Sequence, residues 1–183
     1  MCLIKRYRQW RKRRRDRIYE GPSVDIDGGT RISHDGNAPK EIISRELIQF
    51  SCRFSSVSLY ENESGLKHGV YKFAASKGTD GVCANFECTN PKVFSDGEHK
   101  GIRSEKLLYK LDAALRKYNV AQYNGQYYKV SGLPGFYGAT VDAEYASGET
   151  LYCYNNQDPF LPTEFVQELC EIFGVHRTED EKN

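Results

Sequence analysis

Long apolar runs are absent from this chain of 183 residues, and apolar residues make up only 39% of it. A membrane-spanning helix needs roughly 18 or more apolar residues in succession, and no stretch approaches that length. The basic first residues are not followed by an apolar segment, so the pattern of a secretory signal peptide is missing as well. These two absences predict a cytoplasmic protein without a transmembrane segment.

A dense cysteine framework is also missing, because the six cysteines are scattered along the chain. Free thiols in a reducing compartment are the expected state for such a pattern. A zinc site would draw on Cys83 and Cys88 together with His68 and His99. If residues 82–88 form a strand, however, side chains five apart point to opposite faces. We therefore expect no metal, no cofactor and no catalytic residue, and keep a small hydrolase or zinc-dependent enzyme using these residues as the alternative.

Two other chemical motifs are incomplete. The spacing of Gly132, Gly135 and Gly138 lacks the Lys-Ser/Thr ending and the following helix of a phosphate-binding loop. Asp142 and Glu144 would share one face of a strand, and a pair of carboxylates can serve glycoside hydrolysis. No recognised frame surrounds that pair, so the sequence predicts a solvent-facing acidic stripe instead.

Charge is present but very unevenly distributed. Residues 1–17 hold nine cations and one anion, a net charge of +8, which leaves 17 cations and 24 anions, or −7, for the remaining residues. Such a block is an interaction tail or a solvated arm, and residues 1–20 are interpreted as a basic N-terminal arm. Its candidate anion-binding residues are Lys5, Arg6, Arg8, Trp10, Arg11, Lys12, Arg13, Arg14, Arg15 and Arg17.

The arm is not purely polar, which leaves several partners open. Leu3, Tyr7 and Trp10 would share one face if the arm were helical. Cations with interleaved aromatics suit nucleic-acid phosphates, an anionic membrane surface or the protein's own acidic body. A disordered arm without a specific partner is the remaining alternative.

Turn-forming residues mark the boundaries of the central domain. Residues 21–45 contain Gly21-Pro22 and Asp35-Gly36, which indicates a linker. A single α+β domain is then expected over residues 46–175, followed by a polar C-terminal tail at 176–183.

Within that domain the apolar spacing predicts two main helices, over residues 104–118 and 163–173, the second ended by Gly174. Asn124-Gly125 is interpreted as a two-residue hairpin turn. Since the connections are short, we expect an antiparallel sheet with both helices packed on one face. Strand patterns run from about Leu47 to Leu59, with a bulge or bend at Ser55-Ser56, and over residues 70–75, 82–88, 120–123, 126–130, 139–146 and 150–154.

Tyrosine is abundant, with 13 residues in the chain. Tyrosine offers a flat apolar ring and a hydroxyl, which suits partner surfaces, and strand alternation should place some rings on an exposed face. The alternative is strand propensity and edge packing. The residues predicted to form a partner surface are Tyr127, Tyr128, Tyr137, Tyr152 and Tyr154.

Three runs resemble an uncharacterised bacterial domain family, a domain of unknown function. They are Tyr123-Asn124-Gly125, the run ATVDAEYASGETLY at 139–152, and Asn155-Asn156-Gln157 followed by Pro162. The resemblance covers about residues 45–174. It implies an α+β fold with a terminal helix entered through proline, and it implies no activity.

Together these patterns favour a non-enzymatic binding or adaptor module. The cationic arm is expected to engage nucleic acid or an anionic membrane surface, and the tyrosine-rich sheet a protein partner. Whether the protein is an enzyme stays uncertain, with the balance against it.

Overall fold

The computed structural model describes residues 24–26, 30–56, 65–90, 100–131, 137–158 and 160–175. These residues form an α+β fold, with one mixed sheet and two α-helices. The predicted arm at residues 1–20 and the predicted tail at 176–183 lie outside the described residues, and so do Trp10 and the other anion-binding candidates.

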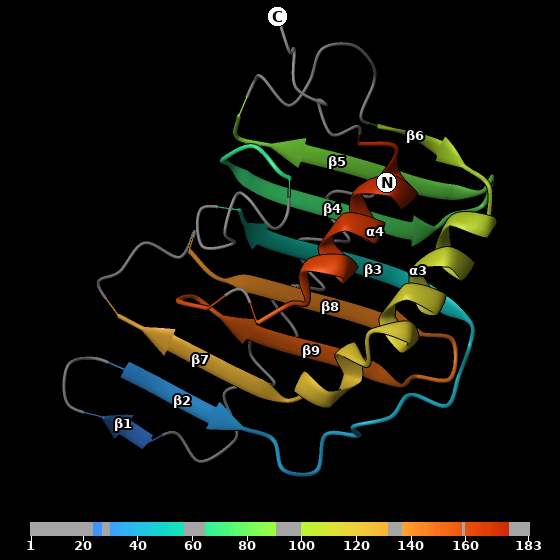
Figure 1. Ribbon diagram of the computed structural model, residues 1–183. Helices are drawn as coiled ribbons and strands as arrows, with labels where there is room; N and C mark the ends of the chain where they lie inside the picture. The colour runs from blue at the N-terminus through green and yellow to red at the C-terminus, as the bar shows by residue number, and fades with distance from the viewer. Residues whose placement is uncertain are drawn as a thin grey trace, which may run out of the picture.

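The sheet has nine strands in the described part of the chain, in the order β1-β2-β7-β9-β8-β3-β4-β5-β6 (Figure 1). The long central strand β3 pairs with β4 on one side and with β8 on the other. The strands are β1 (Val24–Ile26), β2 (Thr30–His34), β3 (Leu47–Ser55), β4 (Val70–Lys77), β5 (Val82–Cys88), β6 (Lys100–Arg103), β7 (Gln126–Val130), β8 (Ala139–Tyr145) and β9 (Thr150–Asn155).

The prediction of an antiparallel sheet is wrong at one pair of strands. β7 and β9 run parallel, with Tyr127 opposite Tyr154 and Tyr128 opposite Asn155. Short connections enforce antiparallel pairing only between strands that follow each other in the chain. Here β8 lies between β7 and β9 in sequence, so the chain reverses twice before it returns beside β7. The sheet is therefore mixed.

Part of the segment predicted to be a linker belongs to the sheet. Strands β1 and β2 lie within residues 21–45, and β2 pairs with β7 along its whole length. Ile42, near the end of the same segment, is buried in the hydrophobic core. β2 reads Thr-Arg-Ile-Ser-His, a polar sequence without the apolar alternation from which strands are recognised.

A short 3-10 helix, η2 (Val120–Tyr123), replaces the strand predicted over residues 120–123. Gly125, with φ of 79°, turns the chain from η2 into β7, so Asn124-Gly125 is not a hairpin turn between two strands. Val120 faces the core and is fully buried. The apolar residues that indicated a strand therefore pack as a single helical turn.

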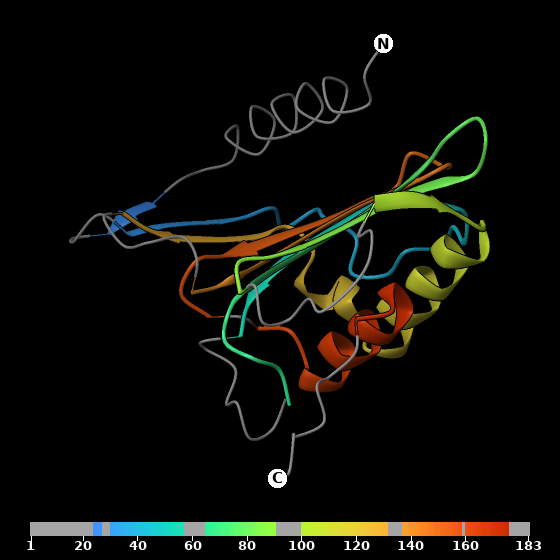
Figure 2. The same ribbon diagram turned by 90° about the horizontal axis from the view of Figure 1, so that it is seen from above.

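The two predicted helices are confirmed as α3 (Lys106–Lys117) and α4 (Thr163–Phe173). Both lie on the same side of the sheet (Figure 2). Gly174, with φ of 72°, ends α4 as predicted. Glu168 on α4 accepts hydrogen bonds from Lys117 Nζ at 2.7 Å and Tyr118 Oη at 2.9 Å, which ties the helices together.

The hydrophobic core fills the space between the helices and the sheet. Alternate residues of the central strands point into it, as the period of two requires. On α4 the buried stripe packs against the same layer. The largest fully buried core side chains are Phe50, Phe54, Tyr71, Phe73, Tyr145, Leu111, Leu151, Phe165 and Leu169.

Candidate functional site

We call the face of the sheet opposite α3 and α4 the outer face, and strands β3 and β8 turn their polar residues toward it. On β8, Val141 and Ala143 are fully buried in the core, so Thr140, Asp142 and Glu144 point the other way. This assignment of the two faces agrees with the sequence prediction for β8. The outer face is the part of the described chain where polar and aromatic side chains of several strands meet.

Asp142 is buried there, with only 4% of its surface exposed. The prediction of a solvent-facing acidic stripe is therefore wrong at this residue. Asp142 lies between two neighbouring strands. Ser51 of β3 lies opposite it on one side, and Tyr152 of β9 lies opposite it on the other side. Ser51 and the neighbouring Thr140 are buried as well, although α3 and α4 cover only the opposite face.

Three of the five predicted tyrosines gather on the outer face. Tyr127 and Tyr154 lie opposite each other on β7 and β9, and their rings stack with centroids 4.9 Å apart. Tyr152 precedes Tyr154 by two residues and therefore points to the same side. Tyr128 points to the helix side, and Tyr137 is exposed just before β8. Tyr127, Tyr128, Tyr152 and Tyr154 are all half-buried.

Charged side chains of both signs surround this aromatic group. Glu144 of β8 and Lys129 of β7 lie on the outer face by strand alternation, and both are half-buried. Arg53 of β3 lies opposite Thr140 and is also half-buried. The outer face thus combines a buried carboxylate, stacked tyrosine rings and long charged side chains.

The cysteines and histidines of the alternative enzyme hypothesis do not come together in the described residues. Cys83 points to the outer face, whereas Cys88 packs against the core on the helix side. His68 is exposed, and His99 lies outside the described residues. Across the parts of the chain that the structure describes, no group of three or more His, Cys, Asp or Glu side chains could hold a metal ion.

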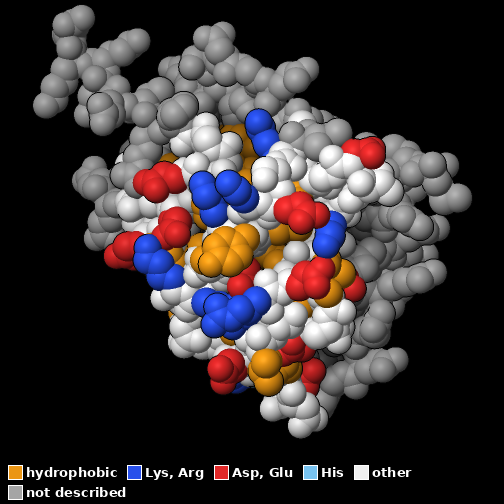
Figure 3. Space-filling view, turned by 90° about the vertical axis from the view of Figure 1, so that its right-hand side faces the viewer, with side chains coloured by type: hydrophobic (Ala, Val, Ile, Leu, Met, Phe, Trp, Pro, Cys, Tyr) orange, Lys and Arg blue, Asp and Glu red, His pale blue; other side chains and the backbone are white. Residues whose placement is uncertain are grey.

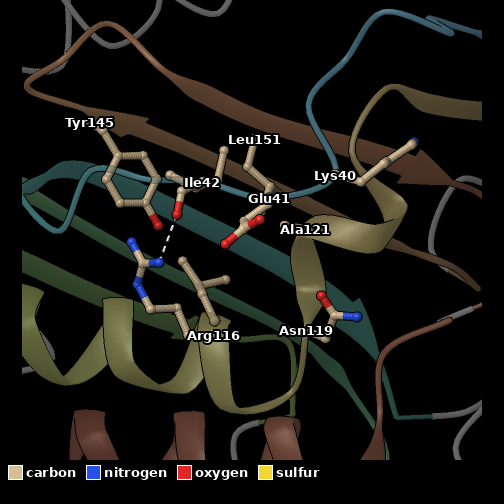
Figure 4. Close-up of a pocket in the computed structure, with 9 residues that line it drawn as sticks. Lys40, Glu41, Ile42, Arg116, Asn119, Ala121, Tyr145 and Leu151 are labelled. Atoms are coloured by element: carbon tan, nitrogen blue, oxygen red, sulfur yellow. Dashed lines mark hydrogen bonds between the residues drawn. The ribbon is translucent and has the colours of Figure 1, made fainter.

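A hollow of about 350 Å³ lies beside the C-terminal part of α3, between the segment at residues 40–42 and strands β8 and β9. Figure 4 shows Arg116 reaching from α3 toward Ile42 and Tyr145, while Lys40 and Asn119 lie at its rim. The hollow combines charged, polar and apolar groups, as a small-molecule site would.

The central polar groups of the hollow form hydrogen bonds with one another. Asp112 accepts hydrogen bonds from Arg116 Nε at 3.0 Å and from Tyr145 Oη at 3.0 Å. Arg116 also donates to the carbonyl oxygens of Ile42, at 2.7 Å, and Ser44. Burial, and then the Asp112 carboxylate, raise the pKa of Tyr145 well above its ordinary value. These contacts hold a neutral phenol and fix the segment around residue 43 to α3.

Glu149 holds the other edge of the same segment. Its carboxylate oxygens accept hydrogen bonds from the backbone N–H groups of Ile43, at 2.8 Å, and Ser44, at 2.9 Å. These bonds, with one from Ser147, lower the pKa of Glu149 below its ordinary value. The backbone of Ile42 to Ser44 is therefore held from both sides by Arg116 and Glu149. We interpret the hollow as part of this structural clamp.

The side of the molecule next to α3 presents no field of a single charge. Figure 3 shows Lys and Arg side chains interspersed there with Asp and Glu, around small hydrophobic areas. Tyr109 on α3 and Ile43 are the most exposed large apolar residues among those described, at 67% and 82%. Single exposed apolar residues of this kind need no partner.

Sequence reasoning predicted a tyrosine surface with some of its rings on an exposed face, but it did not predict two features of the structure. Asp142 gives no sequence signal of burial, since carboxylates on strands are ordinarily solvated. Arg116, four residues after Asp112, reads as a surface ion pair of a helix rather than as a clamp on a distant backbone segment.

None of the described helices is long and apolar enough to cross a membrane. A scan against protein-family models, a search of curated proteins and a search of solved structures each find no match to this chain. No family is therefore assigned, and the outer face stands as the candidate site on the geometry of its own residues.

Proposed function

We propose that this protein is a non-enzymatic binding module whose outer face takes a cationic segment of a protein partner. The observation that carries the proposal is the Asp142 carboxylate, which is buried beside Tyr152 on the face of the sheet opposite α3 and α4. A carboxylate on this face adds negative charge to the surface, and a cationic segment is the ligand of complementary charge.

The tyrosines supply the second half of the recognition. A Lys or Arg side chain over a tyrosine ring gains about 0.5–1 kcal/mol at exposed sites and more when water is excluded. The stacked rings of Tyr127 and Tyr154 present such a surface a few residues from Glu144. A segment rich in Lys and Arg would therefore find both aromatic faces and carboxylates on the outer face.

The proposal also includes the basic arm, supported by the charge of +8 over residues 1–17. The arm would bind an anionic surface, either nucleic acid or a membrane with anionic lipids, with an affinity that falls as salt rises. A cytoplasmic location and kinship with the bacterial domain family that residues 45–174 resemble belong to the same proposal.

The outer face can be tested by titrating a fluorescent Lys/Arg-rich peptide into the full chain and measuring anisotropy. Replacing both Tyr127 and Tyr154 with Ser should weaken binding by about five- to thirtyfold, since two ring contacts of about 0.5–1 kcal/mol each are lost. The matched control is Tyr109→Ser, which removes an exposed ring from α3. Equal affinities for the double variant and the control would reject the outer face as the binding surface.

A further inference from the structure

We propose that the first occupant of the outer face is the chain's own basic arm, residues 1–17. This inference rests on the proposed function in treating the outer face as a surface for cationic segments. It adds that the protein carries its own competitor for that surface, so that partner binding is controlled from within the chain.

The burial of β8 is the first observation. Five consecutive residues, Ala139 to Ala143, are buried, and this run includes side chains of both faces. The described helices α3 and α4 lie on the side of Val141 and Ala143. Strands buried on both faces belong to sheets that are covered on both sides. Thr140 and Asp142 therefore indicate that the outer face, too, is a covered surface.

Charge is the second observation. The arm carries +8, and the remaining residues carry −7. Asp142 and Glu144 place two carboxylates within the outer face, beside Lys129 and Arg53, and cations of the arm would pair with these carboxylates. An intramolecular ligand also has a high effective concentration, on the order of millimolar for a short connection. A segment that is only moderately attracted therefore stays bound.

The connection between arm and face has enough length. β1 begins at Val24, and it is separated from β8 by three strands. Four strand spacings amount to about 19 Å. The residues between Arg17 and Val24 span up to roughly 23 Å when extended, and the arm itself adds more. The arm can therefore lie across β7, β9 and β8 without disturbing β1.

The apolar residues of the arm match the aromatic part of the face. Leu3, Tyr7 and Trp10 follow helical spacing, so a helical arm would present them on one side. That side would meet the rings of Tyr152 and Tyr154, while the flanking cations would reach the carboxylates. Docking would then occupy the basic arm and the outer face at the same time. A nucleic acid or an anionic membrane that binds the arm would release the outer face for a partner.

Trp10 makes the proposal measurable, because it is the only tryptophan in the chain. In the full chain at low salt, Trp10 emission should be blue-shifted relative to a synthetic peptide of residues 1–17. Acrylamide should quench it at least about threefold less efficiently than it quenches that peptide. In 1 M salt the difference should shrink, because screening weakens the attraction.

Variants locate the docking site. Glu144→Lys and Tyr154→Ser should each shift Trp10 emission toward that of the free peptide, whereas Glu171→Lys, exposed on α4, should leave it unchanged. Glu144→Gln serves as a milder second variant, and circular dichroism verifies that each variant is folded. Trp10 that is quenched as fast as in the peptide, or protected but indifferent to the outer-face variants, would overturn the proposal.

The same samples separate this inference from the proposed function. If Trp10 is exposed but the added Lys/Arg-rich peptide still requires Tyr127 and Tyr154, the arm inference fails and the proposed function stands. If Trp10 is protected by the outer face and no added peptide displaces it, the inference stands and binding of a separate partner fails.

Discussion

At the scale of single residues, buried and half-buried polar side chains hold a backbone segment without regular secondary structure, residues 42–44, in place through hydrogen bonds. Asp112 is buried on α3, and its partners Arg116 and Tyr145 come from the same helix and from β8. Asp112 is buried whereas Arg116 is partly exposed, at 4% and 27% of their side-chain surface. Removing a partner of Asp112 leaves a buried carboxylate with fewer hydrogen bonds, which costs about 1–3 kcal/mol. The pair therefore makes the attachment of Ile42 and Ser44 to α3 specific in position.

Glu149 gives this clamp a pH dependence. Its pKa is lowered in the folded protein, so its contribution to stability is present above the unfolded value of about 4.5 and is lost as the pH falls through the folded pKa. Glu149→Gln should lower the free energy of unfolding at pH 7 and flatten its decline below pH of about 4.5. Denaturant unfolding at pH 7 and at pH of about 3 measures both effects.

Glu171→Gln is the control for this prediction, since that side chain is exposed on α4. It should unfold like the unaltered protein at both pH values. A Glu149→Gln variant with the full pH dependence of the unaltered protein would show that Glu149 does not contribute to acid sensitivity.

At the scale of elements, the parallel pair β7–β9 has the shortest register of the described strand pairs, with two residue pairs. Asn156 reinforces it: its Oδ1 accepts from the N–H of Val130 at 2.9 Å, and its Nδ2 donates to the carbonyl of Val130 at 2.9 Å. A buried side-chain amide thus continues the ladder beyond the last strand residue.

Asn156→Ala should loosen β7 at this point, because two buried hydrogen bonds are lost at about 0.5–1.5 kcal/mol each. Amide exchange of Val130 should become at least about tenfold faster, while amides of β3 and β4 should be protected as before. Asn85→Ala on β5 is the control, since Asn85 bonds only an exposed carboxylate, Glu87, among the contacts resolved for it. Unchanged exchange at Val130 would contradict this role of Asn156.

The elements also show where sequence reasoning succeeds. Local signals were sufficient for α3, α4 and the hairpin of β8 and β9, whose turn has Gly148 at φ of 87°. They were insufficient for β2 and for the parallel pairing, because partners far apart in the chain decide both. The tyrosine surface was half predictable: alternation places Tyr152 and Tyr154 together, but it cannot show that Tyr127 of another strand stacks on Tyr154.

At the scale of the whole molecule, the reactivity of the buried cysteines measures how often the fold unfolds globally. Cys52, Cys153 and Cys170 are free thiols buried in the core, and burial raises the pKa of Cys52 and Cys153. A thiol reacts as its thiolate, so Cys52 and Cys153 are protected both by burial and by a raised pKa, and Cys170 is protected by burial. Cys83, on the outer face, is half-buried.

Among the cysteines of the described residues, native labelling with a thiol reagent should therefore modify Cys83 first. The three core cysteines should react at least about a hundredfold more slowly, at a rate set by global unfolding. Peptide mass spectrometry over time gives the rate at each site, and labelling in denaturant gives the reference in which all sites react alike. Core cysteines that label as fast as Cys83 without denaturant would show that the core opens locally.

The position of β9 has a consequence for how the molecule is made. It is the last strand in the described chain, yet it lies between β7 and β8, inside the sheet. A nascent chain that has left the ribosome only as far as residue 149 can pair β2 with β7 and β3 with β8. The strand that joins these two pairs, β9, is not yet available. β7 and β8 then each present an unpaired edge, the kind of surface on which chains aggregate. Translation must therefore pass β9 before this sheet can close.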